Sequence, residues 1–163
     1  MPTKIVHQLH QSPGHWVLAV TGGGSSAISS ILAVPGASKT LLEATVPYDT
    51  NSLHQYVGGK VDQACSAQTA QAMAMAAFIR CQKLLPDSPV DALFGLGCSA
   101  AIATDRTRRG TNRCHVSVQS YNSTTSVSLE FQEDRSRSEE EQLCRDLILM
   151  LMSEASGMEI SLK

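Results

Sequence analysis

The sequence has little charge, few aromatic side chains and no long apolar run. Of its 163 residues, 17% are charged and 4% are aromatic, and the formal net charge is −2. A nucleic-acid-binding surface needs a basic excess or aromatic stacking platforms, so we expect no nucleic-acid partner. No apolar run approaches the ~20 residues that span a bilayer, and the N-terminus does not resemble a secretory signal. We therefore expect no membrane partner and a cytoplasmic location.

Paired cysteines and metal-ligand spacings are also missing. Five cysteines are widely spaced along the chain without a C-x-x-C pair: Cys65, Cys81, Cys98, Cys114 and Cys144. The sequence therefore predicts neither a zinc ribbon nor a thioredoxin-like site, and we expect no metal and no cofactor. We expect most of the thiols to be reduced, small and buried. The length fits a single domain over residues 1–163.

Helix and strand patterns alternate along the chain. We expect strands over residues 15–20, 41–48, 90–97, 114–119 and 125–131. We expect helices before Pro13, over 27–34 and 65–85, and from about Glu139. Asp49 suits a helix N-cap, and Ser138 to Glu141 fits a capping box for the last helix. The alternation predicts an α/β fold, a three-layer α/β/α sandwich with a mixed, partly parallel sheet and an antiparallel final hairpin.

A glycine-rich turn lies between the first strand pattern and the next helical pattern. Its sequence is Thr-Gly-Gly-Gly-Ser-Ser, from Thr21 to Ser26. Strand, glycine turn and helix direct backbone N–H groups and the positive end of a helix dipole at one spot, which attracts phosphate. We expect five residues of this turn to contact a phosphorylated ligand: Thr21, Gly22, Gly23, Gly24 and Ser25. The alternative is a tight turn that holds no ligand.

A second loop after a strand is rich in arginine. We expect it to run from Cys98 to Thr111, and four arginines fall in it or just after it: Arg106, Arg108, Arg109 and Arg113. Guanidinium groups bind phosphate or carboxylate through paired hydrogen bonds. Ligands of α/β sheets lie beyond the carboxyl ends of the strands, where both loops belong. We expect Arg106 to join the phosphate pocket; the alternative is a solvated loop.

Several short motifs resemble a known family in their order and spacing. They are Thr21-Gly22-Gly23, Val34-Pro35-Gly36-Ala37-Ser38, Val46-Pro47-Tyr48, Cys65-Ser66 opening an Ala/Met-rich helix, and Glu133-Asp134-Arg135 before the last helix. This pattern, from about Trp16 to Met152, is similar to the CinA C-terminal domain, the nicotinamide-nucleotide amidase family. The resemblance implies a three-layer α/β/α domain that self-associates and binds a pyridine mononucleotide. It adds Tyr48 and Arg135 to the expected ligand-binding residues.

The chain departs from this family at the two positions that carry its chemistry. Active members hydrolyse the carboxamide of nicotinamide mononucleotide with a serine that precedes Thr-Gly-Gly and a lysine that assists it. By resemblance these positions are Ala19 and Leu53 here. A nucleophile needs an oxygen or sulfur atom within reach of a base, which alanine and leucine do not supply.

Three functions remain open. The first is a domain that binds a phosphorylated pyridine nucleotide without amidase chemistry, as a sensor, scaffold or regulatory subunit. The second is a C–N hydrolase that uses an activated water or a relocated nucleophile, for which Cys98 and Ser25 are the candidates. The third is a structural homo-oligomer with a vestigial pocket. Ala19 and Leu53 favour the first function over the second, and the retained glycine turn and Arg135 favour it over the third.

Overall fold

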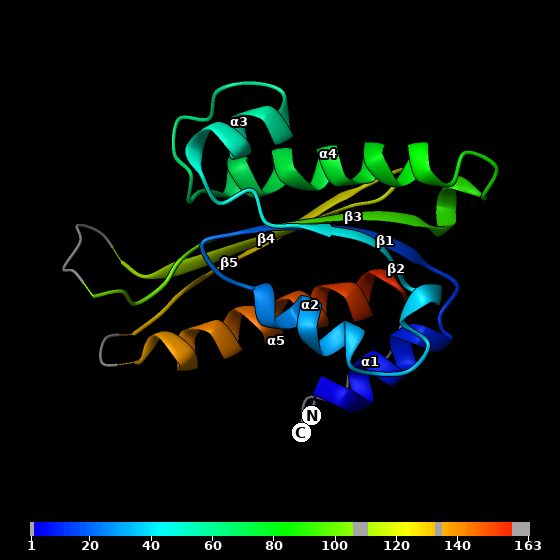
Figure 1. Ribbon diagram of the computed structural model, residues 1–163, viewed down its shortest axis with the longest axis horizontal. Coiled ribbons are helices and arrows are strands. Elements are labelled where there is room, and N and C mark those ends of the chain that lie inside the picture. The colour runs from blue at the N-terminus through cyan, green and yellow to red at the C-terminus, as the bar shows by residue number, and fades with distance from the viewer. Residues whose placement is uncertain (1, 106–110, 133–134, 158–163) are drawn as a thin grey trace.

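A mixed sheet divides the molecule into two helical layers (Figure 1). The computed structural model describes residues 2–105, 111–132 and 135–157. Three helices of this part of the chain lie on one side of the sheet: α1 (Pro2–Gln11), α2 (Ser25–Leu32) and α5 (Arg137–Ala155). Two lie on the other side: α3 (Thr50–Val57) and α4 (Ala67–Leu84). The fold is the three-layer α/β/α sandwich expected from the sequence.

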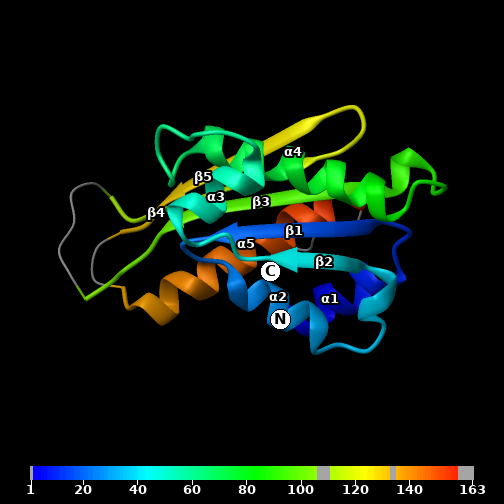
Figure 2. The ribbon, with the colours of Figure 1, turned by 45° about the horizontal axis from the view of Figure 1, so that its top comes forward.

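The sheet has the strand order β2-β1-β3-β4-β5. Its strands are β1 (His15–Thr21), β2 (Leu41–Thr45), β3 (Leu93–Ala101), β4 (Arg113–Gln119) and β5 (Thr124–Glu130). β2, β1 and β3 are parallel, whereas β4 and β5 form an antiparallel hairpin beside β3. The sheet is therefore parallel in part, as expected, and β2 and β5 form its opposite edges (Figure 2).

β1 is the central parallel strand, and both of its faces are covered. Val17 and Ala19 pack toward the layer of α3 and α4, and Leu18 and Val20 pack toward α2 and α5. A strand that is buried on both faces has a nearly continuous apolar sequence, which is the signal that predicted β1. The parallel strands β1, β2 and β3 have their carboxyl ends at the same end of the sheet. The candidate site lies at this end, which is called the carboxyl edge of the sheet below.

The structure corrects the expected bounds of two strands. β3 begins at Leu93, after a 3₁₀ turn at Val90–Ala92, and continues to Ala101 rather than ending at residue 97. Ser99 pairs with Thr21 of β1 and His115 of β4, so residues that were expected in a loop belong to the sheet. β2 ends at Thr45 rather than at residue 48.

The helix caps agree with the sequence in one case and differ in the other. Asp49 Oδ2 accepts hydrogen bonds from Asn51 N at 3.0 Å and Ser52 N at 3.3 Å, which confirms the expected cap of α3. The capping box of α5 pairs Ser136 with Glu139 rather than Ser138 with Glu141, and the helix begins at Arg137. Among the described residues, no helix combines the length and apolar character needed to cross a bilayer.

Candidate functional site

The glycine turn after β1 holds a carboxylate from the last helix. Gly24 N–H donates to both carboxylate oxygens of Glu141, at 2.8 Å and 3.0 Å. Ser26 Oγ donates to the same carboxylate at 2.9 Å, and Ser25 Oγ donates to it at 3.4 Å. A negative group at the N-terminus of α2 is favourable for the helix dipole. An anion thus occupies the turn, as its sequence indicates, and in this structure the anion is part of the chain itself.

The backbone of the turn fits closely against its neighbours. Gly22 and Gly24 have φ values of +80° and +100°, which disfavour side chains. A Cβ atom at Gly24 would lie 2.7 Å from Ile148 Cδ1, and one at Gly22 would overlap the carbonyl oxygen of Ala100. The glycines therefore let the turn approach β3 and α5, and this approach brings Gly24 within reach of Glu141.

Glu140, the neighbour of Glu141, binds the segments that follow β3 and precede β4. Its side chain is 1% exposed. Its Oε1 accepts hydrogen bonds from Ala103 N at 2.6 Å and from Asn112 Nδ2 at 3.1 Å. A buried carboxylate needs such donors to offset its lost hydration. The first turn of α5 thus holds both the glycine turn and the segments that flank β3 and β4.

Ala19 and Leu53 lie together in one buried apolar cluster. Ala19 of β1, Leu53 of α3 and Met73 of α4 are each at most 1% exposed. Tyr56, Val57 and Val61 pack around them. The two positions that the resemblance assigns to a serine and a lysine are therefore brought together, as a catalytic pair requires, but they contain hydrocarbon packed against hydrocarbon.

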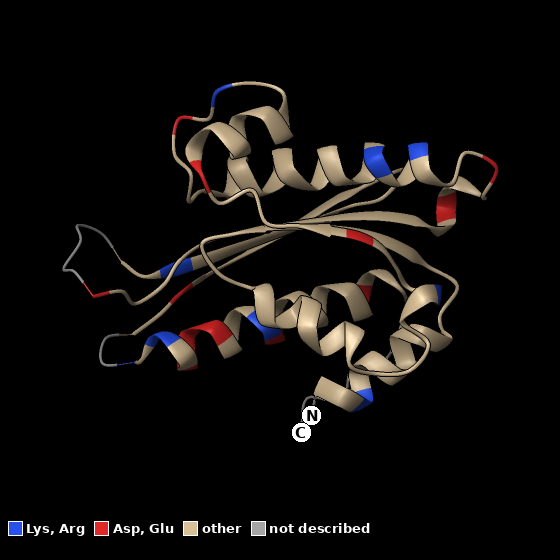
Figure 3. Ribbon diagram, in the orientation of Figure 1, with Lys and Arg blue, Asp and Glu red and all other residues tan. Residues whose placement is uncertain are grey.

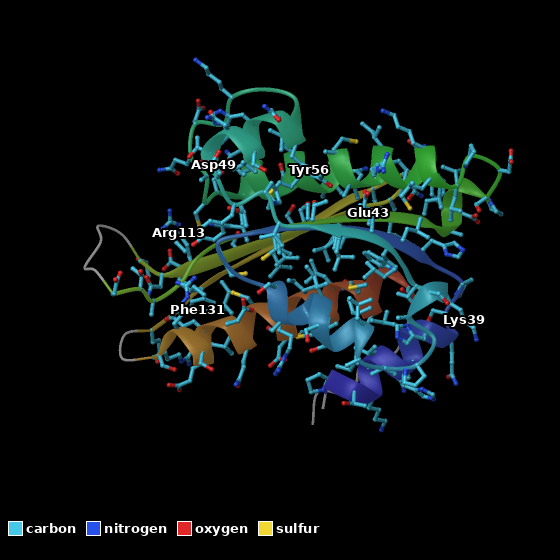
Figure 4. The ribbon with its side chains drawn as sticks, in the orientation of Figure 1. Lys39, Glu43, Asp49, Tyr56, Arg113 and Phe131 are labelled. Atoms are coloured by element: carbon cyan, nitrogen blue, oxygen red, sulfur yellow. The ribbon has the colours of Figure 1, made fainter. Side chains whose placement is uncertain are left out.

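A network of hydrogen bonds holds the start of α4 above the carboxyl end of β3. Ser66 N donates to Ser99 Oγ at 3.2 Å, and Ser66 Oγ accepts from Thr69 N at 3.1 Å as the N-cap of α4. Arg113 Nη2 of β4 donates to Cys65 O at 3.2 Å. Arg113 and Asp49 lie at the same end of the sheet (Figure 4). The network fixes the positive end of the α4 dipole at this edge.

A cavity of about 470 Å³ lies beside the start of α4. It is lined by Lys60, Val61, Asp62, Gln63, Ser66, Gln68, Thr69 and Ala72. A second hollow, of about 620 Å³, lies farther along α4 toward the β2 edge and includes Tyr56, Met75 and Ile79 in its lining. The salt bridge between Arg80 Nε and Glu43 Oε2, 2.8 Å long, joins two residues that line this second hollow.

Comparison with known proteins identifies the architecture. No protein-family model and no curated protein matches the sequence. The structure is similar to the competence/damage-inducible protein CihA of Agrobacterium tumefaciens, with a TM-score of 0.77 and 16% identity over 94% of each chain. The chain has the CinA fold. A competence or damage-inducible protein of Enterobacter asburiae is also similar, with a TM-score of 0.69 and 15% identity over 93% of this chain and 96% of that one.

A third similar structure is a CinA-superfamily protein of Klebsiella pneumoniae. Its TM-score is 0.68 at 13% identity, over 96% of this chain and 92% of that one. The CinA fold therefore extends over nearly the whole chain, which confirms at the level of fold the resemblance seen in the short motifs.

Cys98 lies inside a strand of the CinA fold and not at its end. Its Sγ donates to Gly23 O at 3.5 Å and lies 3.7 Å from Cys114 Sγ, and the side chain is fully buried. The contact with Cys114 lowers the pKa of the Cys98 thiol, but burial and the nearby Cys144 and Glu141 outweigh it and raise the pKa above its ordinary value. A nucleophilic thiol needs the opposite surroundings.

The remaining expected ligand residues are spread over both layers. Ser25 lies in the glycine turn with its hydroxyl near Glu141. Tyr48 is 66% exposed and precedes α3, whereas Arg135 is exposed and precedes α5 in the opposite layer. Arg106 lies outside the described residues. Contacts of Thr21, Gly22, Gly23, Gly24, Ser25, Tyr48, Arg106 and Arg135 with a ligand stay a prediction.

Sequence reasoning missed two residues that organise this edge. Glu140 and Glu141 were interpreted only as part of a helix start, yet each carboxylate binds a different segment of the sheet's edge. Their pattern gives one usable signal, because three consecutive glutamates exceed what a capping box requires.

Proposed function

We propose that this CinA-fold chain binds a phosphorylated nucleotide and lacks the amidase chemistry of the family it resembles. The observation that carries the proposal is the packing of Ala19 against Leu53 and Met73. The resemblance assigns the nucleophile and its lysine to the first two of these positions. Neither of these two side chains has an atom that could attack a carboxamide or a base that could activate a nucleophile. This arrangement supports the loss of the amidase reaction, and the binding half of the proposal depends on the cavity beside α4.

The cavity beside the start of α4 is the site we propose for the nucleotide. Its volume of about 470 Å³ falls within the range of small-ligand pockets, about 300–1,000 Å³. Lys60 and the N-terminus of α4 favour a phosphate group there. Asp62 is suited to accept hydrogen bonds from ribose hydroxyls, and Gln68 adds an amide donor and acceptor. Glu141 already neutralises the glycine turn, which directs the phosphate toward the α4 cavity instead.

A relocated nucleophile is the alternative that the geometry supports less. The surroundings of Cys98 raise its thiol pKa, so at neutral pH the sulfur is protonated. The hydroxyl of Ser25 lies beside the Glu141 carboxylate at 3.4 Å, and this carboxylate also accepts hydrogen bonds from Gly24 N–H and Ser26 Oγ. The carboxylate oxygens are thus already engaged by Gly24 and Ser26, and the Ser25 hydroxyl is the most distant of their three donors. Neither residue therefore replaces the family's pair.

The experiment is a proton NMR titration of nicotinamide mononucleotide with the purified chain, followed for several hours. We expect line broadening of the nucleotide signals without conversion to the nicotinic acid form. Lys60→Ala should weaken binding about tenfold or more, since a hydrogen bond to a charged group contributes about 1.5–3 kcal/mol. Lys83→Ala removes an exposed lysine from the second hollow and should leave binding unchanged.

Three results would contradict the proposal in different ways. Conversion of the nucleotide by the wild-type chain would show that catalysis persists despite Ala19 and Leu53. Sharp, unchanged signals at every protein concentration would show that nicotinamide mononucleotide does not bind. Equal weakening by Lys60→Ala and Lys83→Ala would mean that binding occurs outside the α4 cavity.

A further inference from the structure

Two exposed apolar side chains lie one turn apart on α4, beside the second hollow described above. Met75 is 43% exposed and Ile79 is 44% exposed, and both line this hollow of about 620 Å³. Ala72 and Ala76 belong to the same lining, and their small side chains leave the space beside α4 open. Isolated exposed apolar residues are ordinary on a protein surface. Here four apolar residues of one helix form the wall of a hollow with the volume of a small-ligand site.

α3 forms a second wall of this hollow. Tyr56 and Val57 belong to its lining, and Tyr56 lies beside α4 as well as on α3 (Figure 4). Burial raises the pKa of the Tyr56 phenol, and the nearby Thr45 side chain lowers it by less. The phenol is therefore uncharged at neutral pH. This wall offers hydrocarbon and an aromatic ring, and these two side chains carry no charge that would repel an anion.

The charged residues of the hollow lie toward the C-terminal half of α4. Arg80 and Lys83 follow the apolar residues along this helix, and Figure 3 shows basic positions there and an acidic position on β2. Arg80 Nε donates to Glu43 Oε2 at 2.8 Å, and Arg80 Nη2 donates to Glu43 Oε1 at 3.1 Å. No carboxylate of the described residues forms a salt bridge with Lys83. The hollow therefore has apolar walls and an uncompensated positive charge toward one end.

The length of the α4 wall limits the shape of the occupant. From Ala72 to Lys83 the helix advances about 16 Å, at about 1.5 Å per residue. An extended carbon chain advances roughly 1.2 Å per bond, as an extended backbone does. A saturated chain of about ten carbons is therefore about 12 Å long, which leaves room for its head group beside Lys83. An aromatic acid is shorter and would contact only part of this wall.

We propose that this hollow is a binding site for a medium-chain aliphatic carboxylate such as decanoate. The chain lies between α3 and α4, and the carboxylate binds Lys83 and Arg80. Glu43 accepts two of the five N–H groups of the Arg80 guanidinium, so three stay available for the ligand. Contact with the apolar walls supplies most of the affinity, and the positive end fixes the direction of the chain. Ala72 is the one residue that this lining shares with the cavity proposed for the nucleotide, so the two proposals can fail separately.

The test is a titration of the isotope-labelled chain with decanoate below its micelle-forming concentration, followed by the backbone amide signals in NMR. We expect saturable shifts of the amides of Val57, Met75 and Ile79. Ala76→Phe fills the hollow and should abolish these shifts. Ala33→Phe adds the same ring at an exposed position after α2 and is the matched control, so it should bind decanoate as the wild type does.

Two comparisons test the charged end of the hollow. Lys83→Ala should weaken decanoate binding about twofold to fivefold, since an exposed ion pair contributes modestly. Lys39→Ala removes an exposed lysine outside the hollow and should leave the affinity unchanged. Decanol has the same chain without the charge, so it should bind more weakly than decanoate and equally to the wild type and Lys83→Ala.

Four results would overturn the proposal. Decanoate that causes no saturable shift of these amides does not bind in the hollow, and wild-type affinity in a folded Ala76→Phe variant would place it elsewhere. Equal affinity for decanoate and decanol would remove the carboxylate from the assignment. Tighter binding of naphthoate than of decanoate at the same amides would replace the extended chain by an aromatic acid. If Ala76→Phe fails to fold, the comparison of Lys83→Ala with Lys39→Ala decides, and equal affinities in these two variants would contradict the charged end.

Discussion

The amide of Gly24 and the carboxylate of Glu141 are 117 residues apart in the chain and 2.8 Å apart in the structure. This contact joins the turn after the first strand to the start of the last helix. The Glu141 carboxylate also balances the positive end of the α2 dipole and accepts hydrogen bonds from the turn. The glycine turn therefore has a structural role: it connects β1 and α2 to the start of α5.

Removing the Glu141 charge should destabilise the whole domain. Glu141→Gln retains the shape of the side chain but loses the charge-assisted hydrogen bonds to Gly24 and Ser26, so we expect a loss of about 1–3 kcal/mol in the free energy of unfolding. Urea denaturation measures it. Glu154→Gln, in the exposed last turn of the same helix, is the control and should change stability little. Equal effects of both variants would mean that the contact with the turn contributes nothing.

The same residue distinguishes two positions for a ligand phosphate. Because we assign the phosphate to the α4 cavity, Glu141→Ala should bind nicotinamide mononucleotide as well as the wild type does. Titration with the nucleotide, monitored by the line widths of its proton signals, measures this. Tighter binding by Glu141→Ala would instead mean that phosphate and carboxylate compete for the backbone donors of the glycine turn.

Introducing a lysine at Leu53 tests whether water reaches the buried cluster of Ala19, Leu53 and Met73. A buried lysine has its pKa lowered by about 3–5 units, and each unit corresponds to about 1.4 kcal/mol, so Leu53→Lys should cost several kcal/mol. The unfolded chain binds the proton more tightly than the folded one. Stability of this variant should therefore rise with pH between the lowered pKa and the ordinary value of about 10.4.

The control for this substitution is Leu53→Met, which conserves volume and should cost less than about 1.5 kcal/mol at every pH. Urea midpoints of both variants, measured across the pH range, give the comparison. A lysine variant as stable as the methionine variant, with no dependence on pH, would mean that water reaches position 53. Hydrolysis by an activated water at this position would then regain support.

The buried thiols of Cys98 and Cys144 should resist alkylation. The contact with Cys114 and then burial raise the pKa of Cys144, and burial contributes to the raised pKa of Cys98, so both are protonated at pH 8. Iodoacetamide should modify the partly exposed Cys65 first, and Cys98 only on unfolding. Peptide mass spectrometry over time gives the order. Modification of Cys98 as fast as Cys65 would make it a reactive thiol in an accessible site.

The sequence predicted the elements that depend on local signals and missed those set by distant contacts. The apolar run of β1 and the Asp49 cap are local, and both are confirmed. The end of β3 is not, because Ser99 and Ala100 belong to the sheet only through pairing with β1 and β4. Two Ser-x-x-Glu patterns overlap at the start of α5, from Ser136 and from Ser138. In the folded chain the pattern from Ser136 forms the capping box, because the side chain of Glu141 binds the glycine turn instead.

The candidate site could be predicted in outline alone. Its location at the carboxyl ends of the strands and the pairing of positions 19 and 53 follow from fold class and resemblance. The occupation of the turn by Glu141 does not, because no local pattern specifies a partner so far along the chain. The cavity beside α4 depends on how the segment from Lys60 to Gln63 folds over the helix start, which the sequence pattern leaves undetermined.

The two carboxylates at the start of α5 also impose an order on biosynthesis. β1 and α2 leave the ribosome long before Glu140 and Glu141 are made, and until then the turn between them lacks its counter-charge. Ile148 and Met152, which close the core on that side, arrive later still. β1 is therefore fully enclosed only after α5 has been synthesised. A chain on a ribosome that stalls shortly before this helix would have an incomplete core, which chaperones would bind.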